Sequence, residues 1–136
     1  MPVTKQELDQ ASSVLDGAVA LLKGGGWVRR TWAADRQGKG IGVLDTGACS
    51  YCLMGALRRA REDVNLKYDK PYRLAVGAVM AVIGKFQLPE LVRADDVYRW
   101  SCAIAGWNDN CCSGVADAMR ILREASKLVR EKGIEE

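Results

Sequence analysis

The residues whose spacing comes nearest to a metal or redox site are four of the five cysteines. Cys49 and Cys52 form a Cys-x-x-Cys motif, and the adjacent Cys111 and Cys112 could complete a set of four thiolates. Adjacent cysteines are poor zinc ligands because their side chains diverge, and a redox motif of this type belongs to a βαβ unit, which this sequence does not predict. We therefore expect no metal and no cofactor, and we interpret Cys52 as a small buried hydrophobic residue at the start of a helix.

Histidine, the most common general base and metal ligand, is absent from the sequence. A nucleophilic cysteine would need lysine or arginine to lower its pKa, and Cys49 is the best placed for this because a helix is expected to begin near it. The composition therefore argues against catalysis, and we expect no catalytic residues. The alternative is a small enzyme with Cys49 or Cys52, together with Asp109, in its site.

The tripeptide Trp107-Asn108-Asp109 carries side chains suited to recognition. An indole offers a stacking surface, an amide offers a donor and an acceptor, and a carboxylate offers an acceptor, a set that fits a nucleobase or a backbone edge. The competing interpretation is structural: the tryptophan packs on the core while the other two residues cap the next helix. We expect the tripeptide to lie in a polar loop between two helices.

Positive charge is concentrated in the middle of the chain. The 136 residues hold 20 Lys+Arg and 17 Asp+Glu, a net charge of +3, but residues 23–73 alone hold eleven basic and five acidic residues, an excess of +6. This asymmetry favours an anionic partner at that segment. The alternative is a solvated surface without a partner.

Hydrophobic periodicity predicts a mainly α, compact bundle of about five helices around a buried central helix. A capping-box spacing at Thr4 and three glycines at 24–26 bound a first helix over about residues 5–23. The remaining helices are expected over about residues 47–62, from Asp69-Lys70-Pro71 through Ile83, from Asp95-Asp96 to a stop at Gly106, and from a cap at Ser113 to just before Gly133.

The third of these helices is expected to be the central one, because Leu74–Ile83 is apolar all round. It could be buried within one chain or line a homodimer interface. Between the first two helices, Trp27–Ala33 is rich in β-forming residues and residues 41–44 could return as a second strand. We expect either a short β-hairpin there or an irregular loop packed on the helices.

The N-terminal residues contain no apolar signal-peptide core, and the longest apolar run, Leu74–Ile83, is ten residues, well short of the roughly 20 that span a bilayer. We expect a cytoplasmic protein without membrane contact. Residues 1–136 are expected to form a single helical domain, since domains cluster near roughly 100–150 residues. The odd number of cysteines fits reduced thiols.

Three short motifs occur along the chain in this order: Gly26-Trp27, Cys52-Leu53-Met54-Gly55-Ala56-Leu57 and Ile104-Ala105-Gly106-Trp107-Asn108-Asp109. Together they resemble a family of small uncharacterised proteins found in actinobacteria and their phages, over about Leu15 to Leu128. That family usually follows its Trp-Asn-Asp with a Pro-Gly-Arg-Thr-like cap, which residues 110–113 replace here. The resemblance implies no established activity, and its phage distribution suggests an accessory protein that acts on a host system.

These features predict a non-catalytic binding module for an anionic partner, either a nucleotide-like small molecule or an acidic host-protein surface. As a phage accessory protein it would sequester or block that target in the host cytoplasm. A DNA-binding regulator is disfavoured, because no helix–turn–helix pair is evident and the charge is modest. The site is expected where residues 27–45, the outer face of helix 47–62 and residues 107–113 converge. The expected ligand-binding residues are Trp27, Arg29, Arg30, Trp32, Arg58, Trp107, Asn108 and Asp109.

Overall fold

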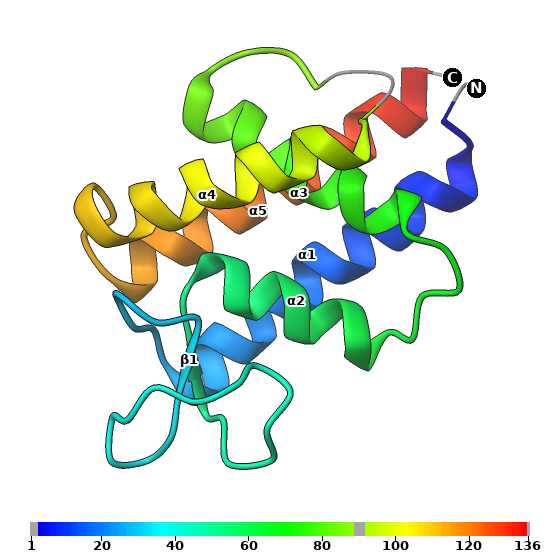
Figure 1. The fold of residues 1–136 in the computed structure, drawn as a ribbon. Coiled ribbons are helices and arrows are strands. Elements are labelled where there is room, and N and C mark those ends of the chain that lie inside the picture. The colour runs from blue at the N-terminus through cyan, green and yellow to red at the C-terminus, as the bar shows by residue number, and fades with distance from the viewer. Residues whose placement is uncertain (1–2, 89–91, 136) are drawn as a thin grey trace.

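The computed structural model of the chain describes residues 3–88 and 92–135. Within these residues five helices form a compact bundle, with a two-stranded sheet between the first two (Figure 1). This confirms the predicted mainly helical architecture. The elements are α1 (Lys5–Gly25), β1 (Ala33–Ala34), β2 (Ser50–Tyr51), α2 (Leu53–Asp63), α3 (Lys70–Gly84), α4 (Ala94–Asn110) and α5 (Val115–Glu135).

Helix α1 begins and ends where its sequence signals indicate. Thr4 and Glu7 form the reciprocal capping box at its start, and Gly26, with φ 111°, ends it. The helix runs two residues beyond the expected stop. Gly25 lies against the backbone of Cys49, where a Cβ would fall 1.7 Å from the carbonyl oxygen. This glycine therefore allows the chain that enters β2 to pass close to the end of α1.

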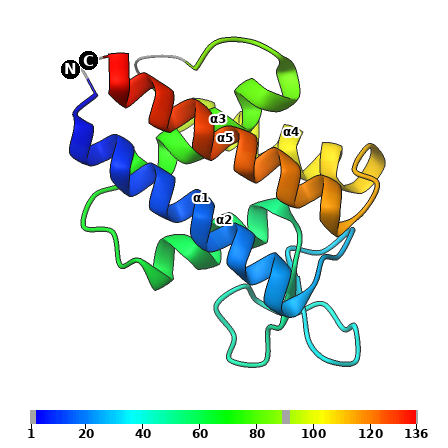
Figure 2. The same ribbon diagram turned by 180° about the vertical axis from the view of Figure 1, so that it is seen from behind.

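Helices α1 and α5 lie side by side and run in opposite directions (Figure 2). Their apolar faces meet around Leu15 and Leu122, both fully buried. A polar contact crosses the same interface, since the Ser12 and Ser126 hydroxyls are 2.9 Å apart and Ser126 donates to Asp16. These hydrogen bonds satisfy the buried hydroxyls and link the two helices at a fixed register.

Helix α3 is buried along most of its length, as its apolar sequence predicts. It packs against α1, α4 and α5, and the residues from Leu74 to Val79 are all buried within this one chain. Gly77 lies directly under Trp100 of α4. The absence of a side chain at this position lets α3 and α4 approach closely.

A short two-stranded antiparallel sheet lies between α1 and α2, as predicted, but its second strand is not the predicted one. Ala33 and Ala34 of β1 pair antiparallel with Tyr51 and Ser50 of β2, whereas residues 41–44 form no strand. Because residues 50–51 are extended, α2 begins at Leu53, six residues later than the expected 47. Figure 1 shows this segment as two loops that project from the bundle near the amino end of α2.

Helix α4 continues through Gly106 to Asn110, so the expected polar loop at residues 107–112 is for the most part the last helical turn. A single glycine inside an otherwise regular helix is tolerated, and Gly106 was therefore a misleading stop signal. Ser113 was expected to cap α5 with its hydroxyl. Instead its amide donates to Asp117, and α5 continues past Gly133 to Glu135.

Candidate functional site

Asn108 connects three parts of the chain at the carboxyl end of α4. Its side chain is completely buried. The Oδ1 oxygen accepts hydrogen bonds from Trp27 Nε1 at 2.7 Å and from the Leu53 amide at 3.1 Å, while Nδ2 donates to the Val28 carbonyl at 3.1 Å. The Leu53 amide is one of the unpaired N–H groups in the first turn of α2. Asn108 therefore caps α2 from another helix and holds the chain that leaves α1.

Asp109 holds the next part of that chain. Its Oδ1 accepts a hydrogen bond from the Arg30 amide at 2.8 Å and from Asn108 Nδ2 at 3.2 Å. Arg30 has φ 66°, a left-handed conformation that is unfavourable for a residue with a Cβ. The carboxylate of Asp109 thus stabilises the strained backbone at Arg30, and Arg30 itself is exposed.

Arg29 is oriented by two contacts of its own. Its guanidinium carbon lies 4.8 Å from the centre of the Trp27 ring, and its Nη2 donates to the Cys112 carbonyl at 2.6 Å. The first contact is a cation–π interaction and the second ties the turn to the connection between α4 and α5. The backbone at residues 27–30 is therefore fixed from both sides.

The amino end of α2 explains the Cys-x-x-Gly motif. Cys52 is the N-cap, and its sulfur accepts a hydrogen bond from the Gly55 amide at 3.3 Å. A Cβ on Gly55 would fall 1.8 Å from the Trp32 carbonyl oxygen, which accepts from the Cys52 amide. Only glycine leaves room for this close approach. The indole of Trp32 is 40% exposed beside this junction.

The two cysteines of the Cys-x-x-Cys motif lie at opposite ends of an extended segment, and Cys52 is buried. Residues 50–51, between Cys49 and Cys52, are extended. Three residues of extended chain place the Cα atoms of these two cysteines about 10 Å apart, which exceeds the roughly 7 Å that a disulfide can span. Burial raises the pKa of the Cys52 thiol to about 11, so this group is neutral near pH 7. In the described part of the chain, no three His, Cys, Asp or Glu side chains could hold a metal ion together.

The structure brings together most of the residues that the sequence singled out. Five of them, Trp27, Arg29, Arg30, Asn108 and Asp109, are joined by the contacts above. Trp107 is half-buried against the core. Arg58 lies farther along α2, where it pairs with Glu62 at 3.7 Å. The two loops therefore converge on the amino end of α2 rather than on its outer face, and Asn108 is enclosed by protein rather than open to a ligand.

Most basic residues of the middle segment fall into two groups. In α2 and α3 they are ion-paired: Arg58 with Glu62, Arg59 with Asp63, and both Arg61 and Arg73 with Asp69. Residues 29–39, which we call the basic loop, carry Arg29, Arg30, Arg36 and Lys39, all exposed. No carboxylate of the described residues forms an ion pair with these four side chains.

Asp35, the single acidic residue of the basic loop, accepts hydrogen bonds from backbone amides. Asp35 accepts hydrogen bonds from the amides of Gln37 at 2.9 Å and Lys39 at 3.0 Å, which shape the turn at 35–39. Arg36 and Lys39 were not among the residues expected to bind. The positive charge excess of residues 23–73 was the one sequence feature that pointed to them. The sequence could not show which of the eleven basic residues form ion pairs in the folded protein.

Comparison with known proteins gives a family without an assigned activity. A family model described as a family of unknown function, DUF6197, matches residues 6–128. No curated protein and no solved structure matches the chain. None of the described helices has the length and apolar character needed to cross a bilayer.

Proposed function

The chain belongs to the DUF6197 family, whose function is unknown, and from this starting point we propose that it is a single-domain, non-catalytic binding module. It engages an acidic surface of another protein through the basic loop. The observation that carries the proposal is the separation of charge: the arginines of α2 and α3 have acidic partners, whereas the four cations of the basic loop have none among the described residues.

The basic loop is also held in one shape before any partner binds. Asp109 fixes the Arg30 amide, Cys112 and Trp27 fix the Arg29 guanidinium, and Asp35 shapes the turn before Lys39. A pre-ordered loop loses less conformational entropy on binding than a mobile one. Three of the four cations are arginines, whose planar guanidinium can bind a carboxylate with two parallel hydrogen bonds.

An acidic protein surface suits this arrangement better than a nucleotide-like molecule. Small-molecule sites are concave and bury roughly 70–90% of their ligand's surface. The four basic residues are instead exposed, on a segment that projects from the bundle. Such a loop can contact a broad acidic face, where each charge pair strengthens and steers the encounter.

The biological setting follows from the resemblance to actinobacterial and phage proteins. In this proposal the protein is an accessory protein in the host cytoplasm, and it blocks or sequesters an acidic host protein. The motifs that carry the resemblance are the residues that shape and hold the base of the basic loop: Gly26-Trp27, the Cys52–Gly55 junction, and Asn108-Asp109.

The proposal is tested by binding of labelled poly-L-glutamate, an acidic polypeptide, measured by fluorescence anisotropy. The variant Arg30→Ala/Arg36→Ala removes two cations of the basic loop. The matched control is Arg99→Ala/Arg123→Ala, which removes two exposed cations from α4 and α5 with the same change in net charge. We expect the loop variant to bind about tenfold or more weakly, since charge-assisted contacts are lost, and the control to bind nearly as the wild type does.

Equal loss of affinity in both double variants would contradict the proposal, because it would show attraction by net charge alone. Tighter binding of a mononucleotide than of poly-L-glutamate, abolished by the same loop variant, would assign the loop to a small anion instead. Affinity should also fall as salt is raised, because exposed charges are screened beyond about 10 Å at 0.1 M salt.

A further inference from the structure

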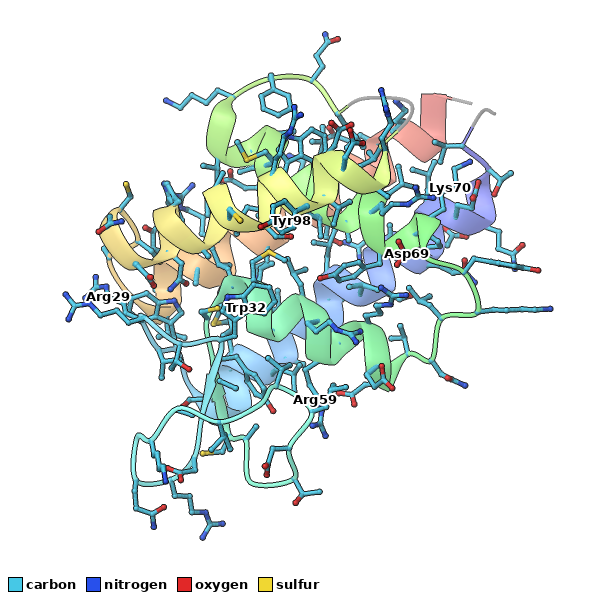
Figure 3. The ribbon with its side chains drawn as sticks, in the orientation of Figure 1. Arg29, Trp32, Arg59, Asp69, Lys70 and Tyr98 are labelled. Carbon is cyan, nitrogen blue, oxygen red and sulfur yellow. The ribbon has the colours of Figure 1, made fainter. Side chains whose placement is uncertain are left out.

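A second cluster of cations lies away from the basic loop, where α2 ends and α3 begins. Arg61 and Arg73 share one carboxylate: Arg61 Nη1 is 2.5 Å from Asp69 Oδ1, and Arg73 Nε is 3.6 Å from Asp69 Oδ2. We call Arg61, Asp69, Tyr72 and Arg73 the Asp69 cluster. Figure 3 shows Asp69 and Arg29 at opposite ends of the molecule, so this cluster and the basic loop are separate places.

The Asp69 cluster contains a buried donor without a hydrogen bond. Arg73 Nε is the one buried side-chain nitrogen or oxygen among the described residues that has no hydrogen-bond partner, because its distance to Asp69 is too long for a hydrogen bond. Buried polar atoms are normally satisfied by protein, water or a ligand. As Asp69 is placed, its carboxylate is close to Arg61 but leaves Arg73 Nε without a hydrogen bond.

The cluster is also shaped to orient what it binds. Tyr72 is buried and its ring lies under Arg61, 4.8 Å from the guanidinium carbon, which restricts the plane of that group. Burial raises the pKa of the Tyr72 hydroxyl, and the charges of Arg58, Arg61 and Asp69 act on it as well. The raised pKa keeps this hydroxyl protonated near pH 7. Arg58, whose own partner Glu62 is 3.7 Å away, adds positive charge nearby.

We propose that the Asp69 cluster is a binding site for a phosphate group, with Arg61 and Arg73 as its main ligands. A tetrahedral oxyanion presents more acceptor oxygens than a carboxylate, so it can satisfy the Arg61 fork and the unpaired Arg73 Nε together. Asp69 then acts as an internal competitor that fills the site in the absence of the ligand. This inference is independent of the basic loop, since the two sites share no residue.

The test uses the full chain with inorganic phosphate and, separately, glycerol 3-phosphate, each measured by isothermal titration calorimetry against chloride at equal ionic strength. Asp69→Asn removes the competing charge and is expected to bind phosphate severalfold more tightly than the wild type. Arg73→Gln is expected to bind about tenfold more weakly, since it loses a charge-assisted contact. Arg59→Gln is the matched control, because Arg59 is ion-paired to Asp63 on the same helix but lies away from Asp69 (Figure 3).

Tighter binding of glycerol 3-phosphate than of inorganic phosphate would identify the natural ligand as a phosphate ester, and the reverse would identify free phosphate. Either result supports the site if Arg73→Gln lowers the affinity for the phosphate compound and Arg59→Gln does not. No heat beyond that of chloride, both in the wild type and in Asp69→Asn, would overturn the inference. So would equal weakening by Arg73→Gln and Arg59→Gln. If Arg73→Gln does not fold, Arg61→Lys, which keeps the charge and removes the planar fork, replaces it and is expected to weaken binding similarly.

Discussion

At the scale of single residues, Asn108 shows how a recognition-like motif can be structural. Its amide has the donor and acceptor that a ligand site would need, but both are used within the protein, by partners 55 to 81 residues away in the sequence. The proposed recognition is carried by neighbouring arginines whose backbone these contacts position. In the proposed function, Asn108 and Asp109 therefore contribute to binding only indirectly, by positioning Arg29 and Arg30.

Replacing Asn108 should cost much stability. Asn108→Ala leaves the Trp27 indole N–H and the Leu53 amide without their acceptor, and an unsatisfied buried donor costs about 1–3 kcal/mol. We expect the free energy of unfolding to fall by about 2–4 kcal/mol in urea denaturation. Asn110→Ala is the control on the same turn, since Asn110 is exposed and bonds only within its own helix. Equal effects of the two substitutions would refute the role of Asn108.

Cys52 gives a prediction about alkaline pH. Burial raises its pKa from 9.0 to about 11, so the unfolded chain loses this proton at a lower pH than the folded protein does. The resulting stability is fully present below about pH 9 and is lost as the pH rises through about 11, with a total of about 2–3 kcal/mol. Cys52→Ser retains a capping acceptor but does not titrate in this range.

The measurement compares urea midpoints at about pH 8 and about pH 10.5, in the presence of a reductant. The wild type should lose more stability between the two pH values than Cys52→Ser does. Tyr51, Tyr72 and Cys112 also have raised pKa values, but they are present in both proteins and cancel in the difference. Identical losses would show that Cys52 is not buried as a neutral thiol.

At the scale of elements, the contact between α3 and α4 depends on a residue without a side chain. A Cβ on Gly77 would lie 3.1 Å from both Trp100 and Val92, which is tighter than ordinary packing. The ring centres of Trp100 and Phe86 are in turn 6.3 Å apart. The position of α4 on the bundle is therefore set partly by the space that Gly77 leaves.

Gly77→Leu should overpack this interface. We expect the free energy of unfolding to fall by roughly 1–3 kcal/mol or more, since Trp100 and Val92 would both have to shift to admit the side chain. Gly106→Leu is the matched control, because Gly106 also lies inside a helix but a Cβ added there would meet no atom within 4 Å. That variant should be neutral or more stable by up to about 1 kcal/mol from helix propensity. Thermal melts of both variants decide the matter, and an unchanged melting temperature for Gly77→Leu would contradict the close packing of α3.

The elements also show what local sequence can predict. The capping box at Thr4 and the apolar stretch from Leu74 predicted α1 and α3 almost as they are, because both signals act within one or two helical turns. The second strand was predicted at residues 41–44, but Ala33 pairs with Tyr51 instead. This pairing could not be predicted locally, since so short a sheet depends on contacts with α1 and α2. The convergence of Trp27 and Asn108 was expected, and the structural alternative for residues 107–109 included core packing and helix capping. The helix that Asn108 caps is α2 rather than the next one along the chain, because α4 continues past Gly106.

At the scale of the whole molecule, charge and packing are arranged independently. The core joins α1, α3 and α5 through aliphatic side chains, while four cations without ion pairs among the described residues lie on the basic loop, which projects near the amino end of α2. An interaction surface on such a loop can change without disturbing the core that holds it. The Asp69 cluster, at the opposite end, would give the same scaffold a second place for an anion.

The stability of this scaffold should require neither metal nor disulfide. The five cysteines are free thiols, and the described residues contain no group of three side chains able to hold a metal ion. A chain of this length can bury about two-thirds of its extended surface, which supports a core without such cross-links. We expect a chelator and a reductant together to leave the melting temperature and the helical circular dichroism unchanged, and Cys49→Ser/Cys111→Ser to unfold within about 0.5 kcal/mol of the wild type. Stoichiometric zinc in the purified protein, lost together with helicity on chelation, would show instead that metal binding contributes to folding.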